Sequence, residues 1–82
     1  MGHFGLYEPL VEQVLTEIRP APWSVEDLRA CQALITAEHC LTVYPHCRPK
    51  DVVDWLHTLS PADQEELVRH LNAEQAARGG GN

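Results

Sequence analysis

Six prolines divide this chain into segments, and the segments carry apolar residues at helical spacing. Proline disfavours helical backbone in the residue before it and lacks an amide donor, so it suits only the first turn of a helix. In four segments the apolar residues recur every three to four positions, as in an amphipathic helix. The fold is therefore expected to be all-α: one small domain of four helices, arranged as a compact bundle or an orthogonal array.

The first helix is expected to begin at Pro9 and to end before Pro20. Its apolar stripe consists of Leu10, Val11, Val14, Leu15 and Ile18. Periodicity does not separate a core-facing stripe from the seam of a homodimer, so a homodimer through this face is an open alternative. Residues 1–8 are expected to form a mobile N-terminal segment before the domain, which spans 9–76.

The second helix has the strongest start signal. Ser24 is a good N-cap with Asp27 at the third helical position, and Trp23 before the cap can pack on Leu28. This helix is expected to run to about residue 40. Residues 41–44, Leu-Thr-Val-Tyr, have β-propensity and form either its last turn or a short extended segment.

Pro49 is expected to open the third helix, and Ser60 with Pro61 to start the fourth. The short turn between them predicts two helices that meet at an angle, as in a helix-turn-helix. The second of these helices opens with the acidic run 63–66, which would repel phosphates. Residues 77–82, rich in glycine, are expected to form a disordered C-terminal tail.

Composition limits the partners of the chain. Its 82 residues make one domain, and a net charge of −6 argues against binding to nucleic acid. No apolar segment reaches the ~18 residues that a membrane helix needs. Three cysteines without a secretion signal are typical of reduced thiols, so a cytoplasmic protein without membrane contact is expected.

Two doublets, His39-Cys40 and His46-Cys47, concentrate soft metal ligands in a short stretch. A zinc site there would use Cys40, His46, Cys47 and a distant ligand such as His57 or His70. The chain lacks the C-x₂-C chelate of structural zinc sites, so no metal or other cofactor is predicted. Cys31 and Cys40 are instead expected to pack as small buried hydrophobes. A zinc-binding or redox-thiol domain centred on residues 39–47 is an alternative, because Arg48 would lower the pKa of Cys47.

Two acid–histidine pairs lie at helical spacing, Asp54 with His57 and Glu66 with His70. Such pairs can act in acid–base catalysis but are usually surface ion pairs. The sequence has no glycine-rich phosphate loop and no nucleophile elbow. No catalytic residue is predicted, and the chain is not expected to be an enzyme.

Binding to another protein is the expected function. Trp55, Tyr44, Arg48 and Lys50 lie on the third helix and the loop before it, and Trp, Tyr and Arg are residue types that anchor interfaces. Alternatively, Trp55 covers the core. The chain is thus interpreted as a small acidic interaction or regulatory module with an unidentified protein partner. A further alternative is an acidic mimic of nucleic acid that inhibits a basic partner.

Overall fold

Five helices make up the computed structural model, which describes residues 7–43 and 45–79. They are α1 (Glu8–Ile18), α2 (Val25–Gln32), α3 (Ala37–Val43), α4 (Pro49–His57) and α5 (Pro61–Gly79), and the described residues contain no strand. The radius of gyration is 12.1 Å, close to the ~12 Å expected for a folded chain of this length. The all-α prediction is confirmed, with one helix more than expected.

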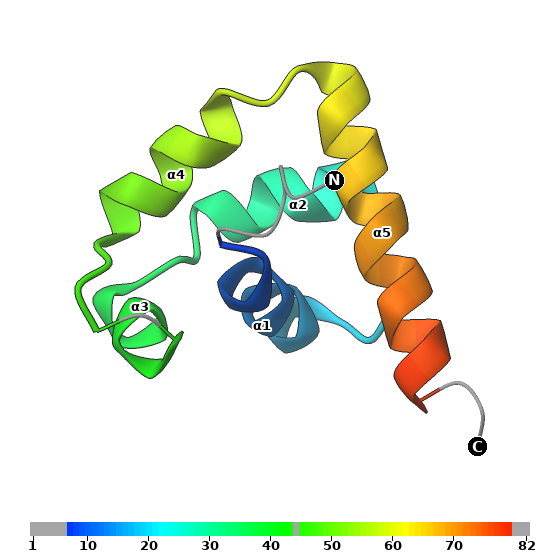
Figure 1. Ribbon diagram of the computed structural model, residues 1–82, viewed down its shortest axis with the longest axis horizontal. Helices are drawn as coiled ribbons and strands as arrows, with labels where there is room; N and C mark the ends of the chain where they lie inside the picture. Colours follow the sequence, from blue (N-terminus) through cyan, green and yellow to red (C-terminus); the bar gives the residue numbers. More distant parts are fainter. Residues whose placement is uncertain (1–6, 44, 80–82) are drawn as a thin grey trace.

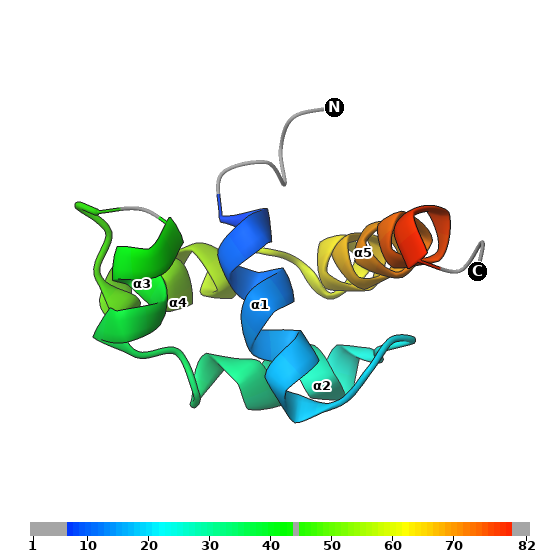
Figure 2. The ribbon, with the colours of Figure 1, turned by 90° about the horizontal axis from the view of Figure 1, so that it is seen from below.

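The helices form an orthogonal array (Figures 1 and 2). Helix α1 packs against α2 and α3, and α5 packs against α2. Helix α1 crosses α2 steeply in Figure 2, and α4 meets α5 at an angle in Figure 1. In the described part of the chain, no helix is both long and apolar enough to cross a membrane.

The predicted stripe of α1 supplies the centre of the core. Leu10, Val11, Val14 and Leu15 are all fully buried within the single chain. They pack with one buried set contributed by the other four helices and the loops: Trp23, Leu28, Cys31, Ile35, Cys40, Val52, Leu56, Leu67, Val68 and Leu71. A homodimer through this face of α1 would therefore find its apolar side chains already covered.

The predicted second helix is in fact two helices. It breaks after α2 because the side chain of Thr36 starts a new helix: its Oγ1 accepts the amide of His39 at 3.3 Å. In return, the Thr36 amide donates to Nδ1 of His39 at 3.0 Å. These local bonds compete with continuation of α2. The break turns Ile35 and Cys40 into the core and leaves Leu34 exposed.

The extended alternative for residues 41–44 is wrong for the described part of that segment, because Leu41 to Val43 continue α3. Tyr44 lies outside the described residues. The β-propensity of this short stretch is overridden by its place at the end of a helix whose Cys40 is anchored in the core.

The predicted starts of α2, α4 and α5 are confirmed. Ser24 and Asp27 form a reciprocal capping box at α2, and Trp23 is buried beside it. The Ser60 hydroxyl accepts the Asp63 amide at 3.1 Å at the start of α5.

The first and last helices extend further than the sequence predicted. Glu8, expected in a mobile segment, is the first residue of α1, and α5 continues through 77–79, where a disordered tail was expected. Gln75 and Arg78 both reach back to Glu12 of α1, which holds the last turns of α5 in place. Residues 1–6 and 80–82 lie outside the described residues.

Asn72 of α5 ties this helix to the connection between α1 and α2. Its Oδ1 accepts the Trp23 amide at 2.8 Å. Its Nδ2 donates to the Trp23 carbonyl at 2.9 Å. One side-chain amide thus satisfies both backbone polar groups of a buried residue.

Candidate functional site

The basic residues predicted to bind a partner lie on the surface. Arg48 and Lys50 are both 82% exposed at the start of α4. Arg48 lies 4.0 Å from Asp51, and Lys50 lies 2.8 Å from Asp54. The bond to Asp54 raises the pKa of Lys50. Each base is thus partnered by an acid on its own helix. Tyr44, grouped with them, lies outside the described residues.

Trp55 is partly buried and packs against the core. Its ring makes an edge-to-face contact with Tyr7, with centroids 5.6 Å apart and planes at 70°. Such a contact stabilises the domain by about 0.5–1.5 kcal/mol beyond the burial of area. The geometry matches the alternative in which Trp55 covers the core.

The three cysteines are free thiols in packed surroundings. Cys31 and Cys40 are fully buried, and Cys47 is half-buried. Burial raises the pKa of Cys47 to about 11, and a hydrogen bond with Cys40 adds to this effect. The pKa of Cys47 is therefore raised, whereas a lowering by Arg48 was expected, because loss of solvation and the neighbouring Cys40 and Asp51 disfavour the thiolate.

Alkylation tests this assignment. Because the thiolate is the reacting form, a pKa near 11 instead of ~8.5–9 should slow iodoacetamide labelling of Cys47 at pH 8 on the order of 100-fold relative to the urea-unfolded chain. Mass spectrometry should show the rate rising about tenfold per pH unit up to about pH 11. The raised pKa should also make the domain less stable above about pH 9, where only the unfolded chain ionises. Fast native labelling at pH 8 would contradict the assignment.

The residues of the alternative zinc site do not lie together. Among the described residues, no three of Cys40, His46, Cys47 and His57 offer ligand atoms close enough to share a metal.

Both acid–histidine pairs are also rearranged. Asp54 bonds to Lys50, four residues before it on α4, and not to His57. His70 pairs with Glu74 and Glu8 in place of Glu66.

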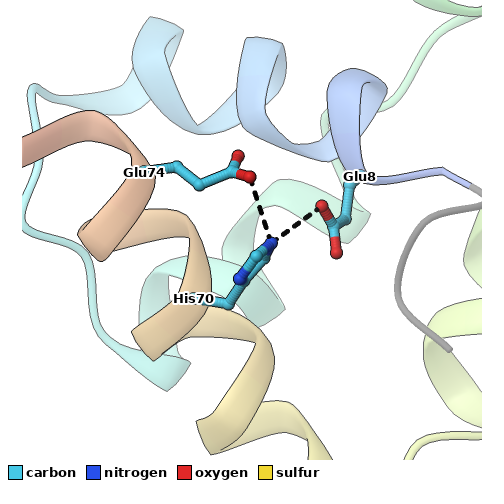
Figure 3. A group of neighbouring side chains, drawn as sticks. All are labelled: Glu8, His70 and Glu74. Carbon is cyan, nitrogen blue, oxygen red and sulfur yellow. Dashed lines mark ion pairs between the residues drawn. The ribbon is translucent and has the colours of Figure 1, made fainter. Parts of the chain in front are cut away.

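Glu8, His70 and Glu74 form a cluster that the sequence did not indicate (Figure 3). Nε2 of His70 lies 3.2 Å from Oε1 of Glu8 and 3.2 Å from Oε2 of Glu74. The Glu8 side chain is 15% exposed. Burial raises the pKa of Glu8; His70 opposes this rise, and Glu74 and Glu12 add to it.

A second feature is a hollow of about 380 Å³ between α1 and α3. Its lining is polar and acidic: Gln13, Glu17, Thr36, Glu38, His39 and Thr42. We call it the α1–α3 hollow. Leu41 follows Glu38 by three residues on α3, so it lies beside the hollow. Leu34 and Leu41, 48% and 63% exposed, are the large exposed hydrophobic residues of the described chain.

His39 in this hollow has a structural role. Nδ1 accepts the Thr36 amide, so the ring hydrogen lies on Nε2, which is 3.1 Å from both carboxylate oxygens of Glu17. A hydroxyl, an imidazole and a carboxylate also occur together in nucleophilic catalysis. Here the Thr36 hydroxyl accepts the His39 amide, and the ring completes a helix cap. The imidazole thus joins the end of α1 to the start of α3.

Comparison of the chain with protein-family models, with curated proteins and with solved structures gave no match.

Proposed function

We propose that the protein is a non-catalytic interaction module that binds a basic amphipathic helix of another protein at the α1–α3 hollow. The observation that carries this proposal is the combination of the acid-lined hollow with exposed Leu41 at its side. A helix with basic and aliphatic side chains on one face would match both features. The net charge of −6 favours approach of such a partner.

The hollow is suited to receiving an ammonium or guanidinium group. Glu17 is 55% exposed, and Glu38 stands exposed on the facing helix. The hydroxyl of Thr36 and the amide of Gln13 add neutral hydrogen-bonding groups to the lining. The bond from His39 fixes the carboxylate of Glu17 before a partner arrives, which lowers the entropy cost of binding.

The test is a titration with a synthetic helical peptide of leucine and lysine, followed by NMR of the backbone amides. Amide shifts should concentrate on α1 and α3. Glu38→Lys and Leu41→Ser should each weaken binding at least about fivefold, the effect of losing ~1 kcal/mol. Glu66→Lys on α5 makes the same charge change away from the hollow and should have a smaller effect.

Two outcomes would overturn the proposal. Equal loss of affinity in Glu38→Lys and Glu66→Lys would show attraction to the whole acidic surface. Binding that is insensitive to Leu41→Ser and lost at moderate salt would show attraction by charge alone, which favours the acidic mimic of nucleic acid.

A further inference from the structure

We infer that Glu8, His70 and Glu74 form a binding site for a divalent transition-metal ion such as Zn²⁺, which joins the start of α1 to α5. The three side chains each offer one ligand atom, and these atoms all lie within 4.8 Å of one another. Figure 3 shows the two carboxylates turned toward the imidazole from the two helices. This site is separate from the α1–α3 hollow, so neither proposal depends on the other.

The distances match a common metal centre. Ligand atoms bound at 2.0–2.1 Å to one tetrahedral zinc ion lie about 3.3 Å apart. The two distances from Nε2 of His70 to the carboxylate oxygens are both 3.2 Å. Two of the three edges of the ligand set therefore already have the length that zinc requires, and the third is no longer than 4.8 Å.

The hydrogen bonding of His70 also favours a metal site. Nε2 carries at most one hydrogen, yet it faces carboxylate oxygens of Glu8 and Glu74 at equal distance. A single N–H cannot align with both acceptors, and hydrogen bonds weaken steeply when bent. A metal ion between the three atoms would bind both carboxylates and the ring nitrogen at once.

Charge and burial also favour a cation. Two carboxylates share one imidazole, and the Glu8 carboxylate is largely removed from water, where an uncompensated charge is costly. Glu74 uses its other oxygen to accept from Arg78 at 3.3 Å. That bond orients the carboxylate, as outer-shell partners of metal ligands do.

The donor set selects the kind of metal. One imidazole nitrogen with two carboxylate oxygens suits Zn²⁺, Co²⁺ or Ni²⁺ better than Mg²⁺ or Ca²⁺, which prefer oxygen ligands alone. Three protein ligands leave at least one position for water. The ion would act as a staple, because Glu8 begins the first helix of the domain and His70 and Glu74 belong to the last.

The test uses the full chain with Co²⁺ and Zn²⁺. One Co²⁺ per chain should bind with the weak visible absorption of nitrogen and oxygen ligands and without thiolate charge-transfer absorption. The paramagnetic ion should broaden amide signals around Glu8 and His70. With Zn²⁺ at 100 times its Kd, the thermal midpoint should rise by roughly 10–20 °C.

Glu66 is a matched control for Glu74, since the two glutamates stand four residues before and after His70. Glu74→Gln and His70→Gln should each weaken Co²⁺ binding by at least about tenfold, whereas Glu66→Gln and His57→Gln should leave it unchanged. Circular dichroism of each variant without metal shows whether the fold is kept. Retained binding in His70→Gln, a thiolate absorption band, or no Co²⁺ bound at millimolar metal would overturn the inference.

Discussion

Leu15→Ala is expected to lower the free energy of unfolding by about 3 kcal/mol, within the range of roughly 2–5 kcal/mol for such core substitutions. Leu15 is fully buried on α1, the helix that packs against both α2 and α3. Removing three carbons there leaves a cavity that the crossed helices cannot close by sliding together. A domain of this size is stable by about 4–12 kcal/mol, so this substitution removes a large part of its stability.

Urea unfolding followed by circular dichroism measures this effect. Leu41→Ala is the matched control, because it makes the same chemical change at a side chain that is 63% exposed. It should change the free energy of unfolding by no more than about 0.5 kcal/mol. Similar losses in the two variants would mean that the assignment of core and surface on α1 and α3 is wrong.

Asn72→Ala is expected to cost about 2–3 kcal/mol, because the buried amide and carbonyl of Trp23 would both lose their partner. Asn72→Asp keeps the acceptor for the amide but loses the donor, and its second oxygen faces the carbonyl. It should therefore also destabilise, which a purely steric role of Asn72 would not predict, since the two side chains have nearly the same size.

The measurement is again the urea midpoint, with Glu66→Ala as control for an exposed polar residue on the same helix. This control should stay within about 0.5 kcal/mol. Hydrogen exchange gives an independent check, since the Trp23 amide should lose protection in Asn72→Ala. If that protection persisted, another acceptor would have to hold the amide.

Local chemistry made the starts of α2 and α5 predictable. Ser24 with Asp27 and Ser60 with Asp63 form the caps that their spacing predicted. The core face of α1 was also predictable, because four of its five stripe residues are fully buried. Both signals depend on residues close together in the chain, so no knowledge of the tertiary structure is needed to read them.

The break between α2 and α3 was not predicted, because the capping residues that cause it are unusual. Thr36 and His39 stand three residues apart, as in a capping box, but His39 takes the place usually held by glutamate or glutamine. The end of α5 was missed for another reason. Its last turns have little apolar periodicity and are held by Glu12 from α1.

The candidate sites depend still more on tertiary structure. The spacing of His70 to Glu74 was visible in the sequence, but it was no more distinctive than that of Glu66 to His70. Glu8 determines which of the two glutamates joins His70 in the cluster. It begins α1, far from His70 in the sequence, and lies on the same side of His70 as Glu74. The α1–α3 hollow likewise exists only because α3 is a separate helix.

The sequence by itself determined the helical class, the starts of α2, α4 and α5 and the apolar face of α1, because these follow from interactions within a few residues. The crossing of α1 over α2, the burial that raises the pKa of Cys47 and the meeting of Glu8 with His70 and Glu74 were decided only by the tertiary structure. The physical reason is that contact and solvation depend on which distant segments pack together. Spacing along one helix does not contain that information.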